Sequence, residues 1–125
     1  MLIPDDLQYS SDHEWLRIEG NRVTVGITDY AQDALGDVVF VQLPTVGDDV
    51  VAGQSISEVE STKSVSDIYA PIAGRIVAVN DVLVGAPEKL NADPYGDAWL
   101  FVLEVDNPDL STLLDASGYH GLTES

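Results

Sequence analysis

The stretch "ISEVESTKSVSDIYAP" (residues 56–71) is the most informative part of the chain, because two β-rich runs flank a short polar turn. The runs "ISEV" and "SVSDIYAP" predict a pair of strands, and the residues from Glu60 to Ser64 predict the turn. Lys63 lies in this turn and is one of only two lysines in the chain. The pattern indicates a β-hairpin that holds a primary amine away from the core.

Two interpretations of Lys63 follow from these residues. It is either a solvated turn residue that pairs with Glu60, or an amine that another enzyme reaches and acylates. An ordinary lysine amine is protonated at neutral pH and is then a poor nucleophile, so a modifying enzyme has to dock on the hairpin and remove a proton. Glu60 and Asp67 are candidates for that docking face. The local pattern leaves both interpretations open.

The segments before the hairpin predict further strands and one helix. "EWLRIEGNRVTVGIT" (Glu14–Thr28) is typical of a hairpin with its turn near Gly20. A short helix is expected over residues 28–35, with Thr28 or Asp29 as its N-cap and Gly36 at its left-handed C-terminal end. A strand is expected over Asp37–Pro44.

The segments after the hairpin continue the β pattern. We expect strands at residues 64–71, 74–80 and 98–105, and an irregular loop at 81–97 that contains the second lysine, Lys89, as a surface charge. A C-terminal helix is expected to begin at Asn107, with Pro108 in its first turn and Leu110, Leu113 and Leu114 on its core face. The pattern favours a mainly β fold, and the length favours a single domain, 1–125.

Composition excludes several classes of function. Five Lys and Arg against 22 Asp and Glu give a net charge of −17, which disfavours nucleic acids and anionic membranes. The chain has no cysteine, so any sulfur chemistry has to come from an added cofactor. No apolar run approaches the ~20 residues of a membrane span, and the acidic start "MLIPDDLQYSSDHE" lacks a basic targeting region. A cytoplasmic location is therefore expected.

A self-contained catalytic or metal site is not expected. His13 and His120 are far apart in the sequence, and neither has the spacing of a zinc motif. No G-x-S-x-G element or phosphate-binding glycine loop occurs, and Asp48 and Asp49 lack the alternation of an EF-hand.

Longer segments resemble the glycine cleavage system H protein family in order and over nearly the whole chain, from about residue 9 to 114. The similar segments are "DHEWLRIEG", "VGITDYAQDALGDVVFVQLP", "EVESTKSVSDIYAPIAGRIVAVN" and "LNADPYGDAWL". The second of these is the most specific, and the third places Lys63 at the family's lipoyl-lysine position.

The resemblance implies a carrier without turnover of its own. Lipoic acid would be attached to Lys63 through an amide by a lipoate ligase or a lipoyl or octanoyl transferase. The arm would take the aminomethyl group of glycine from the P protein (a pyridoxal-phosphate glycine dehydrogenase) to the T protein (an aminomethyltransferase). The L protein, dihydrolipoyl dehydrogenase, would then reoxidise it. The resemblance also implies a flattened barrel or sandwich of two antiparallel sheets, and Glu14 and Asp67 in a cleft for the loaded arm.

Some residues depart from the family pattern, and some alternatives remain. Thr62 and Ser64 stand where Val and Ala are common, Ala98 stands where Gly is common, and Ala34 and Leu35 offer no second histidine in the short helix.

An alternative role is relay of lipoyl or octanoyl groups to 2-oxoacid dehydrogenase domains. Thr62 and Ser64 fit neither a biotinyl domain nor a 2-oxoacid dehydrogenase lipoyl domain, and the intact Lys63 argues against a lapsed carrier.

Overall fold

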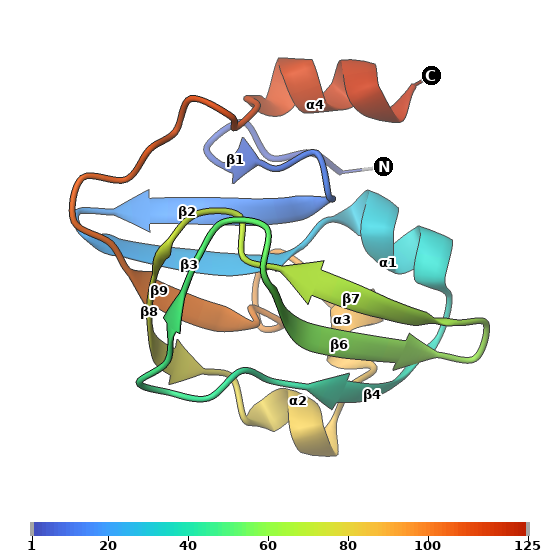
Figure 1. Cartoon of the computed structure of the whole chain (residues 1–125). Helices are drawn as coiled ribbons and strands as arrows, with labels where there is room; N and C mark the ends of the chain where they lie inside the picture. Colours follow the sequence, from blue (N-terminus) through green and yellow to red (C-terminus); the bar gives the residue numbers. More distant parts are fainter. Residues whose placement is uncertain (1, 125) are drawn as a thin grey trace.

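The computed structural model describes residues 2–124 and contains two antiparallel sheets that enclose one main core (Figure 1). The larger sheet has the order β1 (Gln8–Tyr9), β2 (Glu14–Glu19), β3 (Arg22–Ile27), β9 (Phe101–Glu104), β8 (Gly74–Val79), β5 (Asp49–Val50). The smaller sheet has the order β4 (Val38–Gln42), β6 (Ser55–Ser61), β7 (Val65–Tyr69). The two sheets stay separate, so the predicted mainly β fold of two antiparallel sheets is confirmed as a sandwich and not as a closed barrel.

The predicted hairpins and the first helix are confirmed. β2 and β3 pair in register from Glu14 opposite Ile27 to Glu19 opposite Arg22. Helix α1 (Asp29–Leu35) begins after Thr28, whose hydroxyl oxygen accepts a hydrogen bond from the Ala31 N–H at 3.2 Å. It ends at Gly36, whose φ of 81° is a conformation that favours glycine.

The predicted irregular loop over residues 81–97 is wrong in part, because it contains two short helices, α2 (Val82–Gly85) and α3 (Lys89–Ala92). Leu83 in α2 and Leu90 in α3 are both fully buried in the main core. Burial of one leucine from each turn stabilises helices too short to be stable alone. Lys89, which was predicted to lie in an irregular loop, is instead the first residue of α3.

The start of the predicted C-terminal helix is also wrong. Helix α4 (Ala116–Thr123) begins nine residues after Asn107, and the Asp115 carboxylate caps it by accepting from the Gly118 N–H at 2.8 Å. Asn107 has a φ of 53° and is not an N-cap. The Leu114 N–H and carbonyl pair with the backbone of Tyr9 at 2.7 and 2.8 Å. This pairing with β1 competes with helix formation, so Leu110, Leu113 and Leu114 precede the helix.

A second, smaller cluster lies between α4 and the six-stranded sheet. It consists of Leu7, Tyr9, Trp15, Tyr95 and Tyr119, and the rings of Tyr9 and Tyr119 stack with centroids 4.7 Å apart. The Trp15 indole N–H donates to the Pro94 carbonyl at 2.8 Å, so this large side chain is fully buried with its one donor satisfied. The cluster attaches α4 firmly to the sheet.

Replacing Gly26 with alanine is expected to lower the free energy of unfolding by roughly 1–3 kcal/mol in urea titrations. Gly26 lies directly opposite Trp15, and a Cβ there would be 2.5–2.6 Å from three atoms of the buried indole. Gly85→Ala is the matched control, because nothing lies within 4 Å of a Cβ at that position. Equal stability of the two variants would contradict this packing.

Candidate functional site

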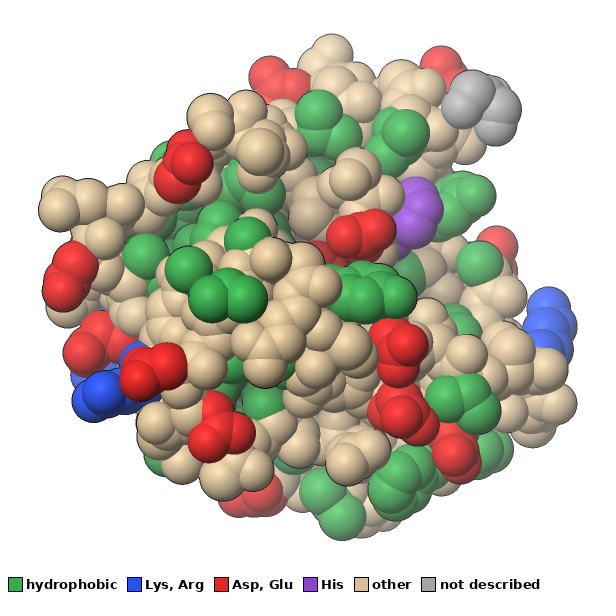
Figure 2. Space-filling model, in the orientation of Figure 1, with side chains coloured by type: hydrophobic (Ala, Val, Ile, Leu, Met, Phe, Trp, Pro, Cys, Tyr) green, Lys and Arg blue, Asp and Glu red, His purple; other side chains and the backbone are tan. Residues whose placement is uncertain are grey.

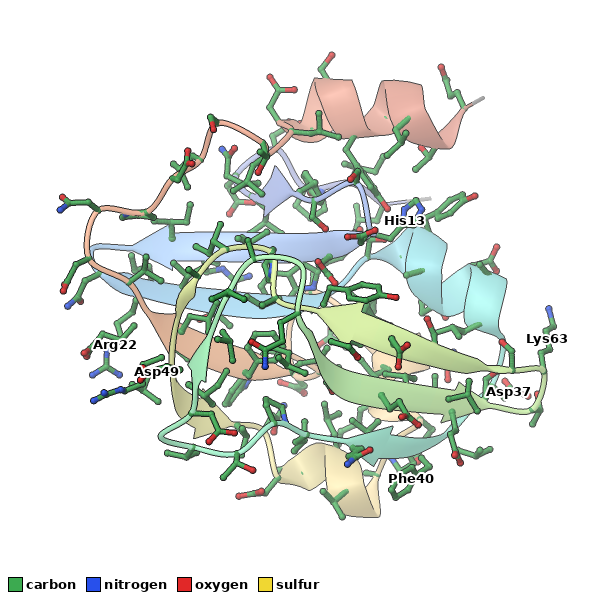
Figure 3. All side chains as sticks on the ribbon, in the orientation of Figure 1. His13, Arg22, Asp37, Phe40, Asp49 and Lys63 are labelled. Atoms are coloured by element: carbon green, nitrogen blue, oxygen red, sulfur yellow. The ribbon has the colours of Figure 1, made fainter. Side chains whose placement is uncertain are left out.

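Lys63 lies in the turn between β6 and β7 (Figure 3), and several hydrogen bonds hold the backbone of this turn. The Ser61 N–H donates to the Ser64 carbonyl at 2.8 Å, and the Ser61 hydroxyl oxygen accepts from the N–H groups of both Lys63 and Ser64 at 3.1 Å. The Thr62 N–H donates to the Asp37 carbonyl at 3.0 Å, which ties the turn to the segment after α1. The backbone that carries the lysine is therefore ordered, while its side chain is exposed.

The Lys63 side chain makes no ion pair with any residue from 2 to 124. The ion pairs in this range are Arg22–Glu104, Arg75–Asp49 and His120–Glu124. Pairing between Lys63 and Glu60, the first interpretation of the turn, is thus not observed. The aliphatic part of Lys63 passes over the backbone of Gly36, where an added Cβ would lie 3.2 Å from Lys63 Cε. The hairpin therefore presents an amine that an enzyme can reach.

Replacing Ser61 with alanine is expected to slow enzymatic acylation of Lys63 about fivefold and to lower the free energy of unfolding by about 1 kcal/mol. The variant loses an acceptor for two backbone N–H groups of the turn, and one such hydrogen bond contributes about 1 kcal/mol. Initial rates measured by intact mass would test this. Ser55→Ala, at the exposed start of β6, is the matched control, and equal rates for the two variants would contradict a role for the Ser61 hydroxyl.

A groove of about 270 Å³ lies between α1 and β7. It is lined along β7 from Ser64, the residue after Lys63, to Ile68. Its α1 side is mostly apolar, and Asp12 and His13 line it from the turn before β2. The residues on the α1 side are Tyr30, Ala31, Ala34 and Leu35. A flexible chain attached at Lys63 has this groove directly beside it.

The structure brings Asp67 into this groove but does not place Glu14 among the lining residues. Asp67 is exposed on β7 and lies opposite Glu58 on β6, with no cation paired to either carboxylate among the ion pairs of residues 2–124. Two carboxylates directly opposite each other on one sheet face are unfavourable. Figure 2 shows Asp and Glu side chains close together over the β6 and β7 face.

Glu14 lies behind the groove, with only 1% of its surface exposed. Its Oε1 accepts from the Ser10 hydroxyl at 2.8 Å and its Oε2 accepts from the Tyr69 N–H at 2.9 Å. Burial raises the pKa of the Glu14 carboxyl to about 8, against the opposing effect of these two hydrogen bonds. The side chain is therefore largely protonated at neutral pH. A role for Glu14 in the cleft stays a prediction.

The sequence pattern did not indicate His13 and Tyr30 as groove residues. Their rings stack with centroids 4.6 Å apart, and His13 has a φ of 68°. A non-glycine residue in the left-handed region is uncommon and is often found at functional sites. A histidine thus lines the groove from the turn before β2, although Ala34 of α1 supplies none.

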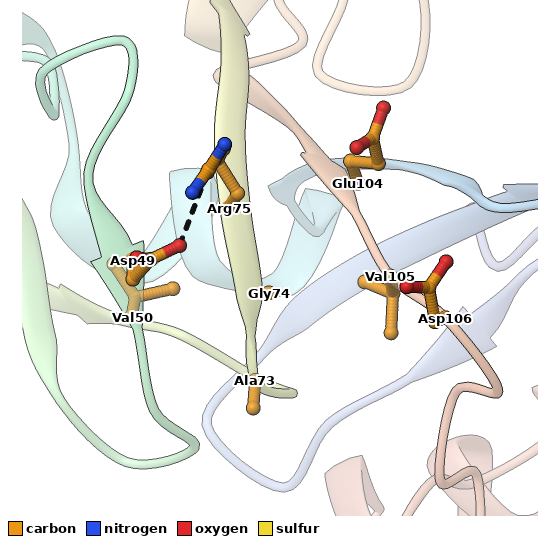
Figure 4. A pocket seen from close by; sticks show the side chains of 8 residues that line it. All are labelled: Asp49, Val50, Ala73, Gly74, Arg75, Glu104, Val105 and Asp106. Atoms are coloured by element: carbon orange, nitrogen blue, oxygen red, sulfur yellow. Dashed lines mark hydrogen bonds and ion pairs between the residues drawn. The ribbon is translucent and has the colours of Figure 1, made fainter.

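A larger groove, of about 550 Å³, lies at the opposite end of the molecule from Lys63 (Figures 3 and 4). Asp49 and Arg75 face each other across β5 and β8 and form an ion pair of 3.2 Å between exposed side chains. Gly74 lies so close to β9 that a Cβ would be 2.9 Å from the Glu104 carbonyl oxygen. These are features of strand packing at the surface, and they bring no reactive group together.

The fold and the site together define a small β-sandwich of two antiparallel sheets, in which an ordered hairpin presents one lysine beside a groove. The family model described as "Glycine cleavage H-protein" matches residues 7–125. The chain belongs to the glycine cleavage H-protein family. Among residues 2–124, no helix combines the length and apolar character needed to cross a membrane.

Individual relatives are similar over nearly their full lengths. A glycine cleavage system H protein of Mycobacterium bovis is 58% identical over 131 residues, with 98% of each chain covered. One of Nocardia farcinica is 61% identical over 125 residues, with 95% of each chain covered. The crystal structure of a glycine cleavage system H protein from Mycobacterium marinum superposes with a TM-score of 0.91 at 48% identity. This superposition covers 98% of this chain and 100% of the Mycobacterium marinum chain.

Proposed function

We propose that Lys63 carries a lipoyl group through an amide bond and that the protein shuttles the aminomethyl group of glycine between the enzymes of the glycine cleavage system. H proteins of this family are the lipoyl carriers of that system. The observation that carries the assignment to Lys63 is its exposed amine, unpaired among residues 2–124, on an ordered turn at the end of the groove. The other lysine, Lys89, begins helix α3 and lies outside this groove.

The residues around Lys63 fit a long, mostly apolar acyl group. The groove beside it has an apolar α1 side formed by Tyr30, Ala34 and Leu35, and β7 contributes Ile68. Contact with these side chains would remove apolar surface of both partners from water. The lipoyl group would supply the disulfide and dithiol chemistry that a chain without cysteine lacks.

A carboxylate beside the groove would hold the amine of the carried group. Asp67 is exposed and lines the groove, so it is our candidate for this ion pair. Glu14 is buried and largely protonated at neutral pH because its pKa is about 8. We therefore assign Glu14 a positioning role, in which its Oε2 fixes the Tyr69 backbone two residues beyond Asp67.

The partners follow from membership in the glycine cleavage system: the P, T and L proteins. A lipoate ligase or a lipoyl or octanoyl transferase would modify Lys63. The chain itself would have no turnover, since its residues bind and orient the carried group while the partners supply the reactive centres. We place this function in the cytoplasm.

Incubation of the protein with a lipoate ligase, ATP and lipoate tests the attachment. Peptide mass analysis is expected to locate the lipoyl mass on the peptide that contains Lys63. A lipoyl mass on Lys89, or on neither lysine, would overturn the proposal.

A further inference from the structure

A chain of three side chains links the groove to the far side of the six-stranded sheet. The Ala31 N–H donates to Thr28 Oγ1 at 3.2 Å, and Thr28 Oγ1 lies 2.6 Å from the hydroxyl of Tyr119. The same Tyr119 hydroxyl lies 2.8 Å from Nδ1 of His13. The N-cap of α1, helix α4 and the turn before β2 thus meet in one hydrogen-bond chain.

Burial fixes the direction of these hydrogen bonds. Thr28 is fully buried, and among residues 2–124 its hydroxyl hydrogen has only the Tyr119 oxygen as acceptor. Tyr119 is also fully buried, and its own hydrogen then has His13 Nδ1 as acceptor. The reverse direction would leave a buried hydroxyl hydrogen without a partner, which is unfavourable. Nδ1 is therefore an acceptor, and neutral His13 carries its proton on Nε2.

Backbone hydrogen bonds and ring stacking fix the position of His13. The His13 N–H donates to the Ser10 carbonyl at 3.2 Å, and the His13 carbonyl accepts from the Thr28 N–H at 3.1 Å. Its ring is stacked on Tyr30. Nε2 has no hydrogen-bond partner among the described residues, and the His13 side chain, labelled in Figure 3, is only half-buried. A fixed N–H donor is thus available in the groove.

We propose that His13 is a positioning residue that donates its Nε2–H to a sulfur atom of the acyl group carried by Lys63. This inference rests on the proposed function. A sulfur atom accepts such a hydrogen bond weakly, whereas an ammonium group cannot accept it at all. His13 is therefore not the base for the carried amine, and the exposed acids of the groove, Asp12 and Asp67, remain as partners of that amine.

The electrostatic surroundings keep His13 neutral. Burial lowers its pKa, and the nearby Asp12 opposes this effect only in part. Protonation of Nδ1 would also reverse the hydrogen bond to Tyr119 and leave one buried hydroxyl hydrogen, that of Tyr119 or of Thr28, without an acceptor. The titratable groups that contact His13 or lie near it in sequence or in the groove are Asp12, Glu14, Tyr30, Asp67 and Tyr119.

Long-range ¹H–¹⁵N NMR on the unmodified, ¹⁵N-labelled full chain tests the tautomer at pH 7.5. The chain has only two histidines, so exposed His120 is an internal reference. We expect the Nε2–H tautomer of His13 to outnumber the Nδ1–H tautomer by at least about five to one, and we expect Tyr119→Phe to lower this ratio. Tyr9→Phe, which removes a hydroxyl bonded to Pro4, is expected to leave it unchanged. An Nδ1–H tautomer, or no response to Tyr119→Phe, would overturn the inference.

Two acylated forms test the contact with sulfur. The Nε2–H proton of His13 is expected to shift downfield in protein carrying a reduced lipoyl group on Lys63 and not in protein carrying an octanoyl group. Equal spectra of the two forms would overturn the sulfur contact. Absence of acylation at Lys63, read by intact mass, would instead contradict the proposed function, while the tautomer measurement on the unmodified chain stands independently.

Discussion

Replacing Lys63 with arginine is expected to abolish lipoylation and carrier activity, to below the detection limit of either assay. Arginine keeps the positive charge and much of the length of the side chain. Its guanidinium remains protonated in proteins and does not form the amide with lipoate. Because Lys63 is exposed and makes no ion pair among residues 2–124, the fold is expected to be unchanged. Intact mass after ligase treatment and circular dichroism check the two statements.

Lys89→Arg is the matched control for this result, because it changes the only other lysine in the chain. The Lys89→Arg protein is expected to accept one lipoyl group at the wild-type rate. A lipoyl mass on the Lys63→Arg protein would show that another residue is the attachment site. Loss of modification in both variants would contradict the assignment equally.

The free energy of unfolding of the wild-type protein is expected to fall by roughly 3–5 kcal/mol between pH 4.5 and pH 8, and replacing Glu14 with glutamine is expected to remove this fall. The pKa of Glu14 is about 8 in the folded protein, above the ordinary carboxyl value of 4.5. The folded state therefore binds more protons than the unfolded state in this window, and the wild-type protein loses stability as pH rises through it. Glutamine stays neutral and retains an oxygen that can accept from the Tyr69 N–H.

Urea titrations of the wild-type and Glu14→Gln proteins at pH 5, 6, 7, 8 and 9 measure this difference. The difference in the free energy of unfolding is expected to grow in favour of the variant up to about pH 8 and then to level off. Glu19→Gln, at the exposed end of the same strand, is the control and should follow the wild type at every pH. A constant difference for Glu14→Gln would mean that this carboxyl is ionised throughout.

Much of the fold was predictable because local and long-range preferences agree in these segments. The hairpin around Lys63 combines β-rich flanks with a polar turn, and α1 has both a capping threonine and a terminal glycine, so each signal is contained within a few residues. The residues after Asn107 show where this fails. Their leucine spacing suits a helix, but the Leu114 backbone pairs with Tyr9, more than 100 positions away. Contacts at that separation are not visible in a local pattern.

The candidate site was predictable to a different degree for each residue. The local pattern left the role of Lys63 open, and it was the resemblance to the family that pointed to Lys63 as the attachment residue and to Asp67 as a cleft residue. The burial of Glu14 depends on the packing of β7 over β2, seen in the hydrogen bond from Tyr69. The place of His13 depends on Tyr119 from the last helix and Tyr30 from the first. Neither could be derived from spacing along the chain.

Exchange of labelled bicarbonate into the carboxyl group of glycine tests the carrier function most directly. The assay would contain P protein, pyridoxal phosphate and either lipoylated or unmodified forms of this chain. We expect exchange with the lipoylated wild-type protein, and only the background of P protein alone with the unmodified or Lys63→Arg protein. No exchange above background with fully lipoylated protein, or equal exchange with the Lys63→Arg protein, would contradict a carrier role based on Lys63.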